Sequence, residues 1–237
     1  PHGADLVAAA GGVSLLVGVA AFTDPLPVAR QPPVVGDAYG LDRERILQLR
    51  PDVAVAWHGG NRETDIAWLG QQGIRVYVSG PRQLADIPRE IREIGELLGT
   101  GEAADGAADR LDARITGLHG HAAGATDVSY VFQVWHRPPM TFGGDALLTR
   151  SLHGCGGRNV FGEVPAETFT PDPESLAGLA SDVEIIADDL GDVPPLTSSA
   201  RTLRVSADAL YQPSPSFVEA VARLCEMLHA DPGRVTR

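Results

Sequence analysis

The sequence contains no lysine. All 19 basic side chains are arginines, against 31 acidic ones, and the formal net charge is −12. Proteins that bind nucleic acid need a basic surface, and proteins that bind anionic lipid need clusters of basic residues. The acidic balance therefore argues against both kinds of partner. Aromatic residues make up only 5% of the chain, so each one that ends a strand gains weight as a candidate ligand contact.

Long apolar runs are also missing. None approaches the roughly 18 residues that span a membrane, and Pro1 does not open a signal peptide with a basic region and a cleavage site. We therefore expect either a mature or trimmed chain or a cytosolic protein. Cys155 and Cys225 leave two interpretations open, which are two buried thiols or one disulfide that closes a loop of about 70 residues in an oxidising compartment.

Motifs of common enzyme classes are absent. The sequence has no GxSxG, GxxxxGK[ST] or HExxH, and its glycine-containing segments do not fit the dinucleotide-binding pattern. His2, His58 and His136 lack the spacing of paired metal ligands, so no metal site is predicted. The pair Asp188–Asp189 ends a strand and is interpreted as a solvated turn. An α/β enzyme that holds a metal with this pair and with histidines is the alternative from another class.

Strand-like and helix-like segments alternate along the chain, which predicts parallel α/β sheets. The expected strands cover residues 13–22, 34–35, 52–57, 74–79, 128–135, 182–189 and 202–208. The expected helices cover residues 3–10, 41–50, 62–72, 82–99, 101–123, 145–157, 173–181 and 215–230. Asp42 is a plausible cap for the second of these helices.

The helix expected over 101–123 separates two α/β sets, with Leu111, Ile115 and Leu118 as its apolar stripe. The predicted fold class is therefore α/β, with two lobes of mainly parallel strands joined by one long helix. We expect an N-terminal lobe over 1–99, an inter-lobe helix over 100–124 and a C-terminal lobe over 125–237.

Two strands run into Trp-His. "VAVAWHGG" leads to Trp57 and His58, and "VFQVWHRPP" leads to Trp135 and His136. Ligands of open α/β sheets bind outside the carboxyl ends of the strands. We therefore expect the two tryptophans to face a cleft that holds a flat or large apolar ligand, with the glycine pair after His58 letting the backbone approach it. The alternative is that each Trp packs on the core of its own lobe.

Glu63 and Glu174 each lie near the expected start of a helix. The helix dipole alone favours a carboxylate there. The functional alternative is a pair of acidic docking points, one in each lobe, for arginines on a partner protein.

Several stretches resemble a known family and together cover nearly the whole chain. They are "PHGADLVAAAG", "LDRERILQLRPDVAVAWHGGN", "GIRVYVSGPRQLADI", "QVWHRPPMTFGGDALLTRSLHGCGGRNVF" and "VSADALYQPSPSFVEAVARLC". The chain resembles the periplasmic substrate-binding proteins of ABC importers that have a rigid helical backbone between two lobes, the class III proteins. Within them it is most similar to the cobalamin-binding proteins.

The resemblance implies a monomeric, exported periplasmic protein, soluble or lipid-anchored, that carries cobalamin or a related corrinoid to an inner-membrane permease. It implies no catalysis, no catalytic cofactor and no resident metal. The implied ligand-binding residues are Tyr39, Trp57, His58, Gly59, Trp135, His136, Met140, Phe169, Asp208 and Gln212. Glu63 and Glu174 are implied to pair with permease arginines, and Cys155 is implied to form a disulfide with Cys225.

The chain departs from the family pattern in three ways. Gln212 stands where the family has an arginine, and Ala166 or Phe169 occupies the region of a family tryptophan. The sequence also starts at a proline that follows the family's first strand, so that strand is expected to be missing.

Two other functions stay open. The first is binding of haem or a ferric siderophore on the same fold, with His2, His58 or His136 as an axial ligand. The second is an interaction module with a closed cleft and no ligand.

Overall fold

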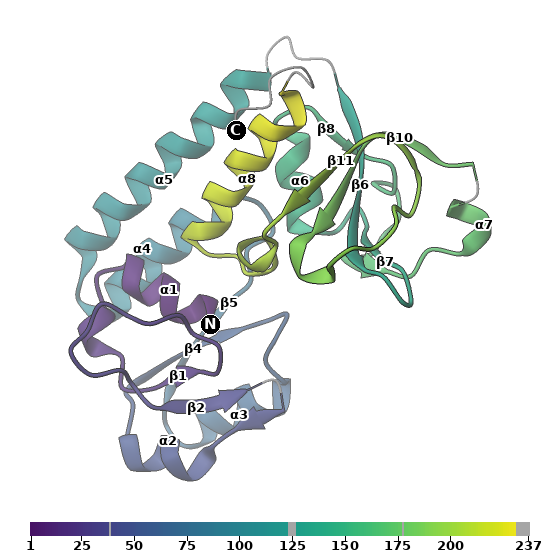
Figure 1. The fold of residues 1–237 in the computed structure, drawn as a ribbon. Helices are drawn as coiled ribbons and strands as arrows, with labels where there is room; N and C mark the ends of the chain where they lie inside the picture. The colour runs from purple at the N-terminus through teal and green to yellow at the C-terminus, as the bar shows by residue number, and fades with distance from the viewer. Residues whose placement is uncertain (38, 123–126, 177, 231–237) are drawn as a thin grey trace. The chain divides into compact units, whose positions relative to one another are not determined.

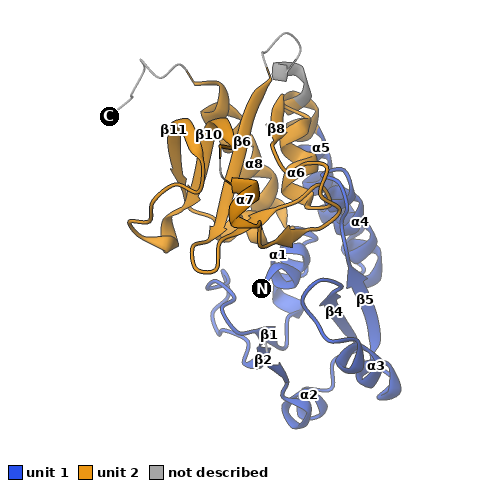
Figure 2. Cartoon of the chain, turned by 90° about the vertical axis from the view of Figure 1, so that its right-hand side faces the viewer, with its two compact units in different colours: residues 1–112 blue, residues 113–237 orange. Residues whose placement is uncertain are grey.

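The computed structural model describes residues 1–37, 39–122, 127–176 and 178–230, with the side chains of 119–122 excepted. The chain forms two compact units, Pro1–Asp112 and Ala113–Arg237 (Figure 2). The division falls within helix α5 (Gly101–Ala122), which begins in the first unit and ends in the second. Among the described helices, none is both long enough and apolar enough to cross a membrane.

The first unit holds two small sheets and four helices besides the first part of α5 (Figure 1). One sheet has the order β1 (Val19–Ala20), β2 (Val34–Asp37) and β3 (Gly40–Leu41), and the other pairs β4 (Val53–Trp57) with β5 (Arg75–Ser79). The helices are α1 (His2–Ala9), α2 (Arg43–Leu49), α3 (Glu63–Gln71) and α4 (Asp86–Leu98), with a 3₁₀ turn, η1 (Val13–Leu15), after α1.

Asp42 caps α2, as the sequence predicts. Its Oδ1 accepts a hydrogen bond from the backbone N–H of Arg45 at 3.0 Å, which satisfies a donor that the helix leaves free. Ile46 of α2 then packs with Leu69 and Ile74 in a buried cluster. Residues of β2 and β4 pack against the same cluster, so the core ties both sheets of this unit together.

Helices α4 and α5 carry apolar stripes with helical spacing. The predicted α5 stripe is confirmed, because its buried residues are Ala104, Ala108, Leu111, Ile115 and Leu118. A Cβ at Gly95 of α4 would collide with the Cβ of Ala104, so glycine is what lets the two helices approach closely there. The expected helix end at residue 123 lies outside the described residues.

The strand predicted over 13–22 is wrong for most of its length. Residues 13–15 form the 3₁₀ turn η1, and only Val19–Ala20 pair with β2. Leu15 and Val17 are 51% and 45% exposed. Apolar composition alone does not make a strand where the segment has no neighbour to pair with.

The second unit contains one six-stranded sheet (Figure 1). Its order is β11 (Ser198–Val205), β10 (Ala180–Ala187), β6 (Val128–Trp135), β7 (Met140–Phe142) and β9 (Thr168–Phe169), and β8 (Gly157–Asn159) also pairs with β6. β6 runs parallel to β10 and β8, and β10 runs parallel to β11, whereas β7 is antiparallel to β6 and β9. The sheet is therefore mainly parallel, as expected, with an antiparallel edge that the sequence did not predict.

Helices α6 (Leu147–His153) and α8 (Pro215–His229) pack together beside this sheet (Figure 1). A disulfide joins Cys155 to Cys225, with their Cα atoms 6.0 Å apart. It ties the turn after α6 to α8 and confirms the pairing that the resemblance implied. Shorter helical segments are α7 (Pro173–Leu176), η2 (Asp188–Leu190) and η3 (Asp208–Tyr211). The helix expected over 173–181 is shorter than predicted, because β10 already begins at Ala180.

Candidate ligand-binding site

In the first unit, aromatic side chains follow the carboxyl ends of three strands. Trp57 ends β4 and is half-buried, and Tyr39 follows β2 and is 88% exposed. Phe22 follows β1, is 91% exposed and has a φ of 61°. A positive φ is uncommon for a bulky residue and is often found at functional sites. Phe22 is not among the residues predicted from the sequence, although it is the aromatic residue that ends the apolar run over 13–22.

The loop after β4 is built around the indole of Trp57. The side-chain Oδ1 of Asn61 accepts a hydrogen bond from the Trp57 backbone N–H at 2.7 Å. A Cβ on Gly60 would lie 2.8 Å from Cζ3 of Trp57, and one on Gly59 would lie 3.2 Å from Cε2. The glycine pair therefore makes room for the indole itself, and the expectation that it also lets the backbone approach a ligand stays a prediction. His58 lies exposed on the same loop.

Three buried polar side chains form a hydrogen-bonded chain behind Trp57. His2 Nε2 lies 3.3 Å from Ser79 Oγ, and Ser79 Oγ donates to Glu90 Oε2 at 2.6 Å. The ring of His2 meets the indole edge-on, with 5.0 Å between the ring centroids. Burial lowers the pKa of His2 to about 4 and raises the pKa of Glu90. His2 is 3% exposed, so the hypothesis that it serves as an axial ligand is wrong; its neutral ring supports Trp57 from inside the unit.

Asp37 anchors the loop that carries Tyr39 through the backbone N–H groups of Tyr39 and Gly40. Asp37 Oδ1 accepts the Tyr39 backbone N–H at 2.7 Å. In α3 of the same unit, Asp65 is 3% exposed and pairs with Arg43 at 3.2 Å and with Arg62 at 2.8 Å. Burial alone would raise the pKa of the Asp65 carboxyl, but the two arginines hold it below its usual range.

In the second unit, one hairpin brings together three predicted residues. Trp135 ends β6 and pairs across the hairpin with Met140 of β7, and His136 lies between them. Trp135 is 52% exposed, and its Nε1–H donates to the Arg137 carbonyl at 3.1 Å. The only polar atom of the indole is thus satisfied within the hairpin, and its exposed surface is apolar.

The other predicted residues of this unit surround the same hairpin. Phe169 of β9 pairs with Thr141 of β7, and Asp208 and Gln212 flank the 3₁₀ turn η3. The ring of Tyr211, in this turn, lies 6.3 Å from that of Phe142 in β7. The structure therefore gathers the hairpin, β9 and η3 in one place.

Tyr211 is a further candidate that the sequence analysis missed. Its hydroxyl is buried and has no hydrogen-bond partner among the described residues. Burial, and then the charges of Asp189 and Asp208, raise the pKa of the phenol, so both acids lie near it. Its place between the predicted Asp208 and Gln212 was the available signal.

Glu63 and Glu174 are both exposed, and both lie in the first turn of a helix. Glu63 is the first residue of α3 in the first unit, and Glu174 is the second residue of α7 in the second unit (Figure 2). No ion pair joins either one to another described residue. Their charges are available to a partner.

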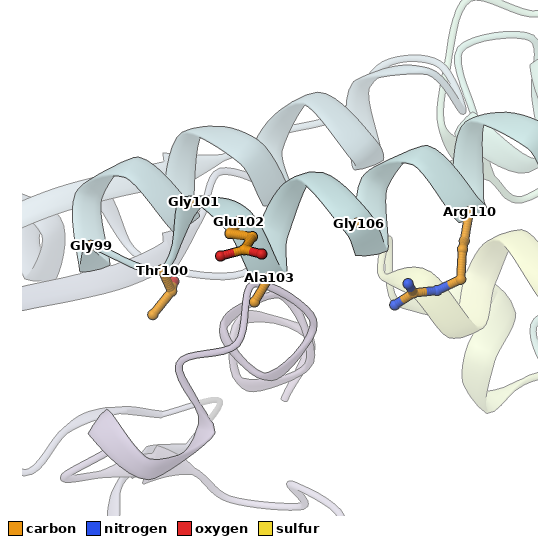
Figure 3. Close-up of a pocket in the computed structure, with 7 residues that line it drawn as sticks. All are labelled: Gly99, Thr100, Gly101, Glu102, Ala103, Gly106 and Arg110. Atoms are coloured by element: carbon orange, nitrogen blue, oxygen red, sulfur yellow. The ribbon is translucent and has the colours of Figure 1, made fainter.

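A shallow hollow runs along the start of α5 (Figure 3). It is lined by Gly99, Thr100, Gly101, Glu102, Ala103, Gly106 and Arg110. None of the predicted ligand-binding residues lies in it. Across the described residues, no group of three or more His, Cys, Asp or Glu side chains has the geometry of a metal site.

Two sequence comparisons with known proteins both find binding proteins. The family model for the periplasmic binding protein matches residues 1–202. The vitamin B12-binding protein of Photorhabdus laumondii is 26% identical over 235 residues, which cover 97% of this chain and 86% of that protein.

Solved structures share the fold. The periplasmic vitamin B12 binding protein BtuF of Vibrio cholerae has a TM-score of 0.86 at 25% identity, with 96% of this chain and 93% of that chain covered. The periplasmic heme-binding protein RhuT from Roseiflexus sp. RS-1, in apo form, has a TM-score of 0.82 at 19% identity, with 96% and 95% covered. At 19% identity, the similarity to the haem-binding protein shows only that the two chains share a fold.

Proposed function

Because the chain belongs to the periplasmic binding protein family, we propose that it captures cobalamin or a related corrinoid and delivers it to an ABC importer. The observation that carries this proposal is the pair of partly exposed tryptophans, Trp57 and Trp135, each at the carboxyl end of a parallel strand in its own unit. Their apolar faces suit a large flat macrocycle. The relatives that are named as vitamin B12-binding proteins support the same ligand class.

In this proposal each unit supplies one aromatic set. Phe22, Tyr39 and Trp57 supply apolar area from the first unit, and Trp135, Met140 and Phe169 supply it from the second. In this proposal Asp208 and Gln212 take the peripheral amides, because a few polar groups fix the orientation of a ligand that apolar burial holds. The protein binds and releases its ligand without converting it.

The test is a calorimetric titration of micromolar protein with cyanocobalamin. We expect binding, and we expect Trp57→Ala or Trp135→Ala to weaken it by about 2 kcal/mol, or about 30-fold, through lost apolar contact. Leu47→Ala is the control, because Leu47 is 49% exposed on α2 and is not a predicted contact. Absence of both heat and a visible-band change with cyanocobalamin and cobinamide would contradict the proposal.

Haem is the second candidate, favoured by the histidines that follow the two tryptophans. His58 is exposed and His136 is half-buried, and imidazole is a common axial ligand of haem iron. A Soret band on haem addition that is lost in His58→Ala or His136→Ala, together with no corrinoid binding, would replace cobalamin with haem as the ligand.

Delivery to the importer is the second part of the proposal. In this proposal Glu63 and Glu174 pair with arginines of the permease; their exposure, and the absence of an ion pair to either among the described residues, support it. Charge pairs of this kind steer orientation more than they add affinity. Export to the periplasm, with or without a lipid anchor, belongs to the same proposal.

A further inference from the structure

One buried carboxylate holds two arginines beside the ligand-binding loops of the first unit. Asp65 of α3 is 3% exposed, and its pKa lies below the usual range, so it is ionised at neutral pH. Its Oδ1 accepts a hydrogen bond from Arg43 Nη2 at 3.2 Å, and its Oδ2 accepts one from Arg62 Nε at 2.9 Å. One arginine would neutralise the carboxylate. Two positive charges and one negative charge leave this Arg–Asp–Arg group with a net charge of +1.

The Arg–Asp–Arg group adjoins both loops that carry predicted ligand contacts. A Cβ on Gly40, the residue after Tyr39, would lie 3.2 Å from Cζ of Arg62. Arg62 also directly follows Asn61, whose side chain accepts the backbone N–H of Trp57. The guanidinium of Arg62 therefore packs against the turn that carries Tyr39 and continues the loop that carries Trp57.

Binding to Asp65 does not use up the two guanidinium groups. The side chains of Arg43 and Arg62 are 49% and 58% exposed. Arg62 contacts Asp65 through Nε and Nη2, so both N–H groups of its Nη1 are open. Arg43 also lies over the ring of Trp68.

Other carboxylates leave these donors open as well. Over the residues that the structure describes, Asp65 is the one acid that pairs with Arg43 or Arg62, and the nearby acids Asp37 and Glu63 form no ion pair with them. A half-exposed arginine that is held in place and keeps open N–H groups suits an anionic oxygen, above all that of a phosphate.

We propose that Arg62, with Arg43 beside it, binds the phosphodiester that links the nucleotide to the corrin ring in complete cobalamins. This inference rests on the proposed function. The other side chains of the corrin end in uncharged amides, so the phosphodiester is the peripheral anion that a net positive group can recognise. Binding is by charge-assisted hydrogen bonds, and no covalent bond changes. The group would make the protein prefer complete cobalamins to cobinamide, which lacks the phosphodiester and the base.

The test compares two corrinoids that differ in this part of the ligand. Cyanocobalamin carries the phosphodiester, and dicyanocobinamide does not. In calorimetric titrations, Arg62→Gln should weaken cyanocobalamin binding at least about fivefold and leave the dicyanocobinamide affinity unchanged. Added salt should weaken cyanocobalamin binding to the wild-type protein more than to Arg62→Gln, because salt screens exposed charges.

Two further variants separate recognition of the anion from support of the fold. Arg62→Gln leaves Asp65 paired with Arg43, so the buried carboxylate keeps a partner and circular dichroism should show a folded protein. Arg43→Gln leaves the pair with Arg62 and should also weaken cyanocobalamin binding selectively. Arg45→Gln is the matched control, because Arg45 is exposed on the same helix as Arg43 and gives the same change in net charge. It should keep full affinity for both corrinoids.

Three outcomes would overturn the proposal. Equal weakening of both corrinoids by Arg62→Gln would mean that the group only supports the loops, and an equal loss in Arg45→Gln would mean that only the overall charge matters. In both cases the proposed function stands. If haem binds and neither corrinoid does, and Arg62→Gln weakens haem, the recognised anion is a carboxylate and the proposed function fails as well.

Discussion

At the scale of single residues, Trp57 is held by neighbours both near to it and distant from it in the sequence. His2 meets its ring edge-on, Asn61 accepts its backbone N–H, and Gly60 leaves space beside its six-membered ring. Ser79 and Glu90 hold His2 in turn. An indole fixed in this way loses little side-chain entropy when a ligand covers it, which favours tight binding.

Gly60→Ala tests whether this placement matters. The new Cβ would lie 2.8 Å from Cζ3 of Trp57, so the indole must move. We expect the corrinoid affinity to fall by about 1.4 kcal/mol, or about tenfold, while circular dichroism stays unchanged. Gly70→Ala in α3 is the control, since a Cβ added there would meet no atom within 4 Å. It should keep full affinity and raise the free energy of unfolding by about 0.5–1 kcal/mol. Equal affinities of the two variants would refute the role of the loop.

The two tryptophans could be predicted from the sequence, but the residues that hold Trp57 in place could not. Trp57 and Trp135 could be predicted because each ends a recognisable apolar strand. The burial of His2 could not, because its hydrogen-bond partner Ser79 is 77 residues away in the sequence. Tyr211 was missed for a similar reason: its environment depends on β7 and on Asp189.

At the scale of elements, the disulfide is the one covalent tie in the second unit. It joins the turn after α6 to α8 across 70 residues of sequence. A closed loop of this length restricts the unfolded chain far more than the folded one. The chain-entropy model assigns it about 4 kcal/mol of stabilisation.

Cys155→Ala combined with Cys225→Ala should therefore lower the free energy of unfolding by about 4 kcal/mol in urea titrations. Reductant should lower the stability of the wild-type protein by a similar amount and leave the double variant unaffected. An unchanged midpoint for the reduced wild-type protein would mean that α6 and α8 hold together without the bridge.

The elements that the sequence predicted well are those with a long periodic pattern. The α5 stripe and the buried runs of β6 and β10 needed no knowledge of their neighbours. β7, β8 and β9 were missed, because each has only two or three residues. Such strands exist only through pairing with partners that the chain supplies elsewhere, and the prolines before Met140 made that segment resemble a loop.

At the scale of the whole molecule, the net charge of −12 is spread over both units, and two exposed glutamates stand out by position. Glu63 and Glu174 begin helices in different units, so a partner that recognises both must engage both units. The overall negative charge alone would attract a basic partner surface, whichever glutamates made the contact. The test therefore needs a control variant with the same change in net charge at other positions.

Glu63→Arg combined with Glu174→Arg should reduce stimulation of the cognate importer's ATPase at least about tenfold, through loss of charge complementarity. Corrinoid affinity should not change. The control is Glu44→Arg combined with Glu102→Arg, since these residues also lie in the first turns of helices and give the same change in net charge. Full ATPase stimulation by the first variant, or equal loss in both, would reject these glutamates as the specific docking points.

The distribution of the three tryptophans has a practical consequence. Trp57 and Trp135 are the candidate ligand contacts, whereas Trp68 packs against the first unit's core with the guanidinium of Arg43 4.9 Å from its ring centroid. Intrinsic fluorescence therefore comes from two tryptophans that a bound macrocycle would quench directly and from a third, Trp68, that packs beside the first unit's core. The chain carries its own optical reporter for ligand capture, without any attached dye.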